Sequence, residues 1–217
     1  TTWSDSDLGS VRVHTVDSEK ETILTLEPGH YVEPTFSPDG NTVVYRKAQG
    51  GGIVDPRWSN NPGIYRVPTD GGTPQFLLRE GRTPHFADHP ERLFFTHRGA
   101  DGPTLEELHI TTRQRMVRAQ SKFATRMRVS PDGNVLAFSE NYRAYSIPFP
   151  KTGKPLQIGP KMKGLPLRSV SSRSGRDLQF SGDGSAILWS EGPTLWSSTQ
   201  SSKAGKPQKI ATIQLNT

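Results

Sequence analysis

The stretch Phe36-Ser37-Pro38-Asp39-Gly40 recurs as Val-Ser-Pro-Asp-Gly at 129–133 and as Phe-Ser-Gly-Asp-Gly at 180–184. Each copy ends an alternating segment, and an apolar run follows it, at 42–45, 135–138 and 186–189. The motif predicts a hairpin turn: Ser suits the first turn position, Pro presets φ, Asp is tolerated third, and Gly takes the left-handed fourth position. Three copies in phase predict a repeat architecture.

The spacing of the motif predicts the kind of repeat. Phe36 and Phe86 are 50 positions apart, Phe86 and Val129 are 43 apart, and Val129 and Phe180 are 51 apart. In the third unit the turn sequence is lost, because 87–90 reads Ala-Asp-His-Pro. A period of this size with strand-like content is typical of a β-propeller built from four-stranded antiparallel blades.

The fold class is therefore all-β, and residues 1–217 are predicted to form a single propeller domain. We expect four whole blades and a partial one, at 31–80, 82–119, 124–160, 170–214 and, for the partial blade, 10–27. A six-bladed propeller would need roughly 70 more residues, at about 45 per blade. We therefore expect the chain to be part of a six-bladed or larger propeller, or to close in an unusual way.

Composition agrees with many short strands and tight turns. Only 31% of the residues are hydrophobic, while Gly (21) and Pro (18) are abundant, and the apolar residues stand in ordered alternation rather than in a disordered pattern. Cysteine is absent, which excludes disulfides, thiolate chemistry and Cys-based zinc sites. No apolar stretch is long enough for a membrane span, so we expect no membrane insertion.

The net charge of +6 is unevenly distributed. Residues 151–176 carry seven basic side chains and no acidic one: Lys151, Lys154, Lys161, Lys163, Arg168, Arg173 and Arg176. This run is either an anion-facing patch or a solvated basic loop. Because no aromatic residue interleaves with it, we expect no nucleic-acid partner. The chain starts Thr-Thr-Trp, so we expect a signal peptide to be already removed or never present.

Longer motifs resemble a known family. Residues 31–47 and 62–65, the segments 129–133 and 141–145, and the segments 180–183 and 189–193 resemble the TolB-like (WD40-like) propellers, and most closely the N-terminal propeller of bacterial TolB-like amidohydrolases. The resemblance covers about residues 28–200 and implies an exported, periplasmic or secreted protein. It also implies a metal-dependent hydrolase domain beside the propeller. The divalent metal would belong to that domain, and no cofactor is expected in this chain.

A catalytic or metal site is not predicted in this chain. An amidohydrolase metal site needs a His-x-His motif, and none of the six histidines (His14, His30, His85, His89, His97 and His109) forms one. His85 and His89 have helical ligand spacing, but Pro84 and Pro90 flank them, so they are either a metal pair or, as we favour, turn and strand-end histidines.

Three other sequence features each allow both a functional and a purely structural interpretation. Residues 181–185 contain the letters of a serine-hydrolase elbow but stand where the repeat places a turn. The triple glycine at 50–52 could cradle an anion with its amides, although a flexible insertion is the interpretation we favour. Trp58, in the same insertion, is either a ligand platform or a local packing residue.

One face of the propeller is the predicted binding face. The loop between the second and third strands of a blade opens on the same face as the link between blades, so the insertion 47–62 and the link 159–170 should share it. Its candidate binding residues are Arg46, Lys47, Arg57, Trp58, Lys161, Lys163 and Arg168.

Three functions remain open on the sequence alone. The chain is a non-catalytic module that scaffolds or gates a hydrolase domain, or a free-standing periplasmic propeller that binds another protein, or an enzyme with a site at the propeller mouth. The partner is thus a hydrolase domain of the same protein or another protein, and oligomerisation stays open.

Overall fold

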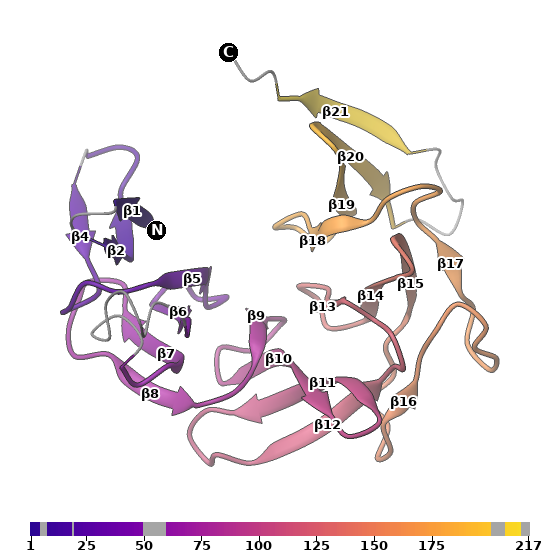
Figure 1. Ribbon diagram of the computed structural model, residues 1–217, viewed down its shortest axis with the longest axis horizontal. Helices are drawn as coiled ribbons and strands as arrows, with labels where there is room; N and C mark the ends of the chain where they lie inside the picture. Colours follow the sequence, from indigo (N-terminus) through magenta and orange to yellow (C-terminus); the bar gives the residue numbers. More distant parts are fainter. Residues whose placement is uncertain (5–7, 19, 50–59, 201–206, 214–217) are drawn as a thin grey trace. The chain divides into compact units, whose positions relative to one another are not determined.

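The computed structural model describes residues 1–4, 8–18, 20–49, 60–200 and 207–213. Within these ranges there is no helix, and 21 strands form six sheets (Figure 1). Contacts divide the chain into two compact units: unit 1 is 1–97 with 108–114, and unit 2 is 98–107 with 115–217. The predicted all-β class is confirmed.

Unit 1 begins with two small antiparallel sheets. The strands β1 (Thr2–Ser4) and β2 (Leu8–Ser10) form the first, and β3 (Arg12–His14) and β4 (Glu21–Ile23) form the second. The β3–β4 hairpin stands where the partial blade was predicted, whereas β1 and β2 were not expected. The next sheet follows the repeat closely, with the order β5 (Tyr31–Phe36), β6 (Thr42–Lys47), β7 (Gly63–Pro68) and β8 (Gln75–Leu78).

The third repeat forms a sheet of five strands. Its order is β16 (Leu156–Gln157), β12 (Arg115–Gln120), β11 (Gly102–His109), β10 (Arg92–Gly99) and β9 (Arg82–Phe86). The outermost strand, β16, comes from the segment predicted to belong to the following repeat, and it pairs in parallel with β12. The sequence-based boundary at residue 160 therefore differs from the observed pairing.

Two further sheets lie in unit 2. The first has the order β13 (Arg126–Val129), β14 (Val135–Glu140), β15 (Arg143–Pro148) and β17 (Arg168–Ser169). The second has the order β18 (Arg176–Phe180), β19 (Ala186–Glu191), β20 (Thr194–Thr199) and β21 (Gln208–Thr212). The strand β17 lies inside 159–170, which we expected to be an irregular link, and it completes the sheet of β13.

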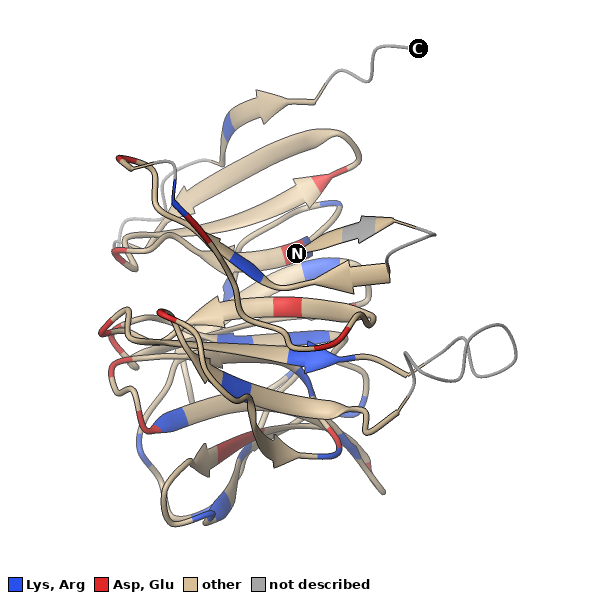
Figure 2. Cartoon of the chain, turned by 90° about the vertical axis from the view of Figure 1, so that its left-hand side faces the viewer, with Lys and Arg blue, Asp and Glu red and all other residues tan. Residues whose placement is uncertain are grey.

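The three repeated motifs form the predicted turn. In the first copy Gly40 has φ of +73°, and its amide donates to the Ser37 carbonyl oxygen at 2.9 Å. The Ser37 hydroxyl donates to the Asp39 carboxylate at 2.5 Å and accepts from the Thr42 amide at 3.0 Å. The other two copies repeat these bonds, so 181–185 is a turn. Figure 2 shows acidic residues in turns at strand ends.

The third repeat keeps a turn although it has lost the motif. His89 stands in the position of Asp39, and its Nδ1 accepts a hydrogen bond from the Glu91 amide at 3.1 Å, as the Asp39 carboxylate accepts one from the Asn41 amide at 3.2 Å. An imidazole nitrogen thus replaces a carboxylate oxygen as the acceptor.

The turn aspartates give the protein an acid-sensitive feature. In each motif the serine hydroxyl, and the backbone amide of the second residue after the aspartate, donate hydrogen bonds to the aspartate carboxylate. These bonds lower the pKa of Asp39 below its ordinary 3.8 and lower the pKa of Asp183 to about 2. At Asp132 partial burial acts in the opposite direction, but hydrogen bonds from Ser130 and Asn134 outweigh it and lower its pKa too.

We expect the stability contributed by these turns to be fully present above about pH 4 and to fall as the pH drops towards 2, because the unfolded carboxylates bind protons first. Urea unfolding across this range should show a shallower acid loss in the triple variant Asp39→Asn/Asp132→Asn/Asp183→Asn, since the Asn oxygen can accept the bonds from the serine hydroxyl and the backbone amide without titrating. Asp70→Asn, in a turn without the motif, is the matched control. An unchanged acid loss in the triple variant would contradict the assignment.

Separate hydrophobic clusters hold the sheets. In unit 1 one cluster joins Val11 and Leu24 to Val43 and Val67, and another packs Phe95 against Ile64. In unit 2 a third cluster surrounds Trp189, which is 1% exposed; its other members are Ala137, Ala144, Val170, Leu178 and Ile187. Burial on both faces accounts for the apolar runs that follow the first two motif turns, in β6 and β14.

A second feature repeats three residues before Phe36, Phe86, Val129 and Phe180, the residues at which the four turn segments begin. We call this place in each repeat the clasp position. It is occupied by Glu33, Thr83, Arg126 and Asp177, and three of these have positive φ: Glu33 (58°), Thr83 (50°) and Asp177 (52°). In unit 1 the Glu33 Oε2 atom accepts from the Thr83 amide at 2.9 Å. In unit 2 the Arg126 guanidinium lies 3.8 Å from the Asp177 Oδ1 atom. The clasp position therefore joins the first strand of one sheet to the first strand of the next.

Candidate functional site

Two of the predicted binding residues are engaged inside unit 1. The Arg46 Nε–H donates to the Glu33 Oε2 atom at 2.8 Å, and the same oxygen accepts the Thr83 amide. Lys47 is 7% exposed, and its Nζ lies 6.0 Å from the centre of the Tyr31 ring and 3.9 Å from the Glu27 carboxylate. The structure therefore gives both residues internal partners.

The surroundings of Lys47 are aromatic. The rings of Tyr31, Tyr45, Tyr65 and Phe76 follow one another with centroid distances of 5.4, 5.9 and 5.4 Å. Burial, and then the nearby Glu27 carboxylate, raises the pKa of Tyr31 to about 12. The Tyr31 hydroxyl donates to the Glu27 carbonyl oxygen at 2.7 Å, so this phenol serves the fold as a neutral donor.

Arg168 also has internal partners. One guanidinium nitrogen donates to the Thr199 carbonyl oxygen at 2.6 Å and the other donates to the Ser198 hydroxyl. Desolvation by burial lowers its pKa. Arg57, Trp58 and the glycines 50–52 lie outside the described residues. That the insertion 47–62 and the segment 159–170 share one face stays a prediction.

The basic run 151–176 is not one loop, because β16 and β17 lie within it. Lys161 and Lys163 are exposed in the turn that follows β16, where the Met162 amide donates to the Gly159 carbonyl oxygen at 3.1 Å. The structure leaves these two predicted residues on the surface and brings other loops beside them.

Four loops of unit 2 meet at one end of the strands: 121–125, 140–143, 159–163 and 171–175. We call this surface the basic face. The strands β12 and β16 run in parallel, so the first and third loops leave the sheet at the same end. The Ser121 hydroxyl donates to the Glu140 carboxylate at 2.9 Å, and the Ser139 hydroxyl donates to the Gly175 carbonyl oxygen at 2.5 Å. Hydrogen bonds therefore hold three of the loops together, and the pairing of β16 with β12 places 159–163 beside them.

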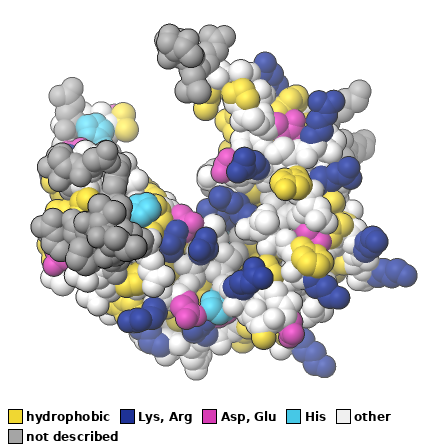
Figure 3. Space-filling view, viewed as in Figure 1, with side chains coloured by type: hydrophobic (Ala, Val, Ile, Leu, Met, Phe, Trp, Pro, Cys, Tyr) yellow, Lys and Arg dark blue, Asp and Glu magenta, His cyan; other side chains and the backbone are white. Residues whose placement is uncertain are grey.

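The basic face combines exposed cations with exposed aromatic rings. Tyr142 is 83% exposed and Phe123 is 65% exposed. Five basic side chains are exposed in the same four loops: Lys122, Arg143, Lys161, Lys163 and Arg173. On the face seen in Figure 3, Lys and Arg side chains are interspersed with hydrophobic ones over the region of β13 to β17.

The sequence prediction missed Lys122, Phe123, Tyr142 and Arg143 as members of this surface, and it named Arg173 only as part of the basic run 151–176. One signal was available for Tyr142. The pair Asn141-Tyr142 joins two strands paired up to Glu140 and Arg143, and φ is positive at both residues, 49° and 65°. A two-residue hairpin turn of this kind favours Asn-Gly, so a tyrosine in the glycine position is unusual.

The carboxylates near the basic face have partners. Glu140 is 6% exposed and binds the Ser121 hydroxyl. At the margin, the Asp177 carboxylate accepts the Ser190 hydroxyl at 2.7 Å, and the Glu191 carboxylate accepts the Ser174 amide at 3.3 Å. The four loops therefore present positive charge outward.

The two spaced histidines have structural roles. The His85 ring is 5% exposed, its Nδ1 lies 2.9 Å from the Thr83 carbonyl oxygen, and the ring stacks on Phe94. The His89 ring accepts the Glu91 amide within its own turn. Among the described residues no three His, Asp or Glu side chains group closely enough to hold a metal ion. In the same ranges no helix is long and apolar enough to cross a membrane.

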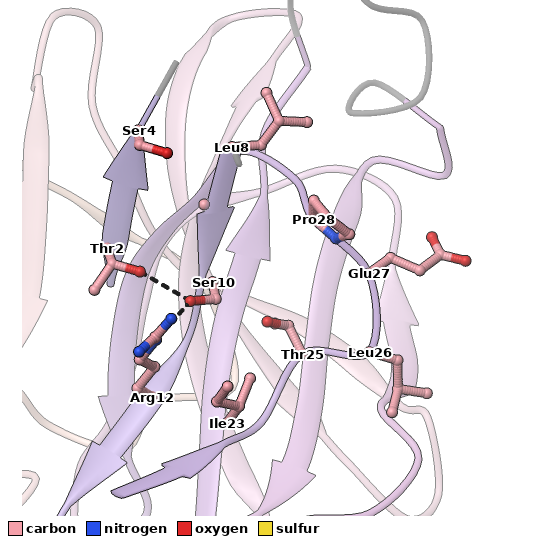
Figure 4. A pocket seen from close by; sticks show the side chains of 11 residues that line it. Thr2, Ser4, Leu8, Ser10, Arg12, Ile23, Thr25, Leu26, Glu27 and Pro28 are labelled. Carbon is pink, nitrogen blue, oxygen red and sulfur yellow. Dashed lines mark hydrogen bonds between the residues drawn. The ribbon is translucent and has the colours of Figure 1, made fainter. Parts of the chain in front are cut away.

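Unit 1 has a pocket of about 390 Å³ between its small N-terminal sheets (Figure 4). Its lining is mostly polar, and the cation there is already bound: the Arg12 Nε–H donates to the Ser10 hydroxyl at 2.9 Å, and its other end donates to the Glu21 carboxylate at 2.6 Å. The Thr2 and Ser10 hydroxyls are 2.8 Å apart. The pocket offers hydroxyl groups but no free charge from Arg12.

Comparison with solved structures identifies the architecture. TolB from Acinetobacter baumannii superposes with a TM-score of 0.62 and 16% sequence identity, over 92% of this chain and 50% of that chain. The fold is a β-propeller. Each of the four larger sheets is thus a blade, as predicted. This chain spans about half the length of that TolB.

Two further propellers are similar. A chain from a nidogen/laminin complex gives a TM-score of 0.59 at 14% identity, over 88% of this chain and 71% of that chain. A TolB-like protein from Agrobacterium tumefaciens, described as a putative TolB, gives 0.50 at 10% identity, over 92% and 87%. No family model and no curated protein matches the sequence. The TolB-like resemblance is confirmed at the level of the propeller fold.

Proposed function

We propose that this chain is a non-catalytic propeller module that binds a protein partner, and that it scaffolds or gates a metal-dependent amidohydrolase domain. The observation that carries the binding role is the basic face, where exposed cations and aromatic rings from four loops lie on one end of unit 2. Exposed aromatic residues grouped with arginine are typical of protein interfaces.

The amidohydrolase partner rests on the sequence resemblance of the segments around the three turn motifs. The divalent metal would lie in that partner domain, and the pair would act in the periplasm or outside the cell. The nidogen/laminin structure supports a binding role in general, since a chain of this fold takes part there in a protein complex. A free-standing periplasmic propeller that mediates protein–protein interaction is the second candidate, and the propeller fold shared with TolB supports it as well.

The test begins with the genomic reading frame around this sequence. A neighbouring barrel with a His-x-His motif supports the first candidate, and a frame without one supports the second. The whole polypeptide is then treated with an amine-reactive cross-linker and digested for mass spectrometry. We expect cross-links from Lys122, Lys161 or Lys163 to the hydrolase domain. Cross-links confined to the propeller would contradict a scaffold that uses this face. Ester or amide hydrolysis by the purified propeller alone would contradict the non-catalytic assignment.

A further inference from the structure

We infer that the basic face binds a carboxylate-rich, acidic segment of the partner polypeptide, with Phe123 and Tyr142 taking apolar side chains of the same segment. This inference rests on the proposed binding role and adds the chemistry of the partner.

The charge of the surface gives the first argument. Five exposed cations project from the four loops, and the one carboxylate within those loops, Glu140, is buried. A surface carrying a single sign of charge steers partners of the opposite sign and rejects partners of the same sign. Acidic side chains of a partner would therefore find several cations and no exposed competing carboxylate within the four loops.

The bracing of the loops gives the second argument. The Ser121 hydroxyl accepts the Phe123 and Ala124 amides at 3.2 and 3.0 Å while it donates to Glu140. The Ala144 amide donates to the Ser171 hydroxyl at 2.8 Å, which fixes the last loop against β15. The backbone that carries Lys122, Arg143 and Arg173 is thus held before a partner arrives, which reduces the entropy that binding must offset.

The exposed rings give the third argument. Tyr142 has φ of +65° and is 83% exposed, so it occupies a costly conformation without burying its ring in the propeller. A partner that covers this ring and that of Phe123 would bury apolar area beside the cations. This combination fits a polypeptide in which acidic and apolar side chains are mixed.

A nucleic acid fits this surface less well. Single strands are bound along a continuous basic groove with successive stacking aromatics, whereas these cations project from four separate loops and only two of those loops carry a ring. An anionic lipid surface would attract the cations and would also accept exposed rings at its interface, so phosphatidylserine vesicles enter the test as the rival ligand.

The test uses fluorescence anisotropy with a labelled peptide of alternating Glu and Leu residues and the whole propeller-containing protein. We expect the charge-reversal variant Arg143→Glu/Lys161→Glu/Lys163→Glu to bind at least about tenfold more weakly at low salt. The matched control is Lys151→Glu/Lys154→Glu/Lys209→Glu, which reverses three exposed lysines outside the basic face and should bind as the parent does. Equal losses in both variants would mean general charge attraction and would overturn the inference.

Two further arms separate the alternatives. Tyr142→Ala/Phe123→Ala should weaken peptide binding by about three- to tenfold even at 0.5 M salt, where charge attraction is screened. Tighter binding of a single-stranded oligonucleotide or of phosphatidylserine vesicles than of the peptide would overturn the inference. The charge-reversal variant keeps Lys122 as a cross-linking site; if it still cross-links to the hydrolase domain through Lys122 as the parent does, the inference fails while the proposed function stands. Peptide binding without any cross-link to the hydrolase domain would support the inference and contradict the proposed scaffold function.

Discussion

Replacing Trp189 with alanine is expected to lower the free energy of unfolding by about 3–5 kcal/mol, because it removes the largest fully buried side chain of the described core. The ring packs among Ala137, Leu178 and Ile187. Because a packed core relaxes only partly around a truncated side chain, the substitution leaves a cavity. Urea unfolding followed by circular dichroism measures the change without relying on tryptophan emission.

Two further variants serve as controls for this experiment. The Trp189 Nε1 atom is buried and has no hydrogen-bond partner among the described residues, so Trp189→Phe should cost only about 1–2 kcal/mol. Phe123→Ala, on an exposed ring, should change stability by less than about 0.5 kcal/mol. A Trp189→Ala loss as small as that of Phe123→Ala would show that this cluster does not hold the unit together.

Replacing Gly102 with alanine is expected to cost about 2–4 kcal/mol, even though it adds a single methyl group. Gly102 has φ of +125°, and a Cβ atom there would lie 2.3 Å from the Ser121 carbonyl oxygen and 3.1 Å from the Lys122 Cα. Both contacts are backbone, so relief requires moving the link that carries Lys122 and Phe123.

Gly99 is the matched control in the same hairpin. A Cβ at Gly99 would meet its nearest atom, the Gly102 carbonyl oxygen, at 3.4 Å, and its backbone does not have the left-handed φ. Gly99→Ala should therefore change the thermal midpoint by only a few degrees. If both alanine variants melt together near the parent, the close approach of β11 to the Ser121 link is not a constraint on the fold.

The repeat made most of the fold predictable. The motif fixes a turn through contacts within six residues, so the strands on either side of it, at 31–36 and 42–47 for example, could be placed from sequence. Non-local pairing could not be placed. The strand β16 joins β12 across 37 residues (Ala119 with Leu156), and a two-residue parallel strand has no sequence signal of its own.

The candidate site was predicted only in part, for a related reason. A basic residue in a loop or strand end can be exposed or can find a partner far along the chain. Arg46 meets Glu33 and Arg168 meets Thr199, and these partners are 13 and 31 positions away. Lys161 and Lys163 have no such partner in their own turn and stay exposed. Tyr142 and Phe123 come from different loops, which the Ser121–Glu140 bond and the bond from the Thr125 amide to the Ser139 carbonyl oxygen hold together.

The clasp position has a consequence for building longer propellers from this sequence. In unit 1 the Glu33 carboxylate binds a backbone amide, which every residue except proline offers, so tandem copies of the 31–80 blade could each clasp the next. In unit 2 the clasp is a side-chain pair, Arg126 with Asp177, and tandem copies of the 124–170 blade would set arginine against arginine. A consensus propeller should therefore be duplicated from residues 31–80.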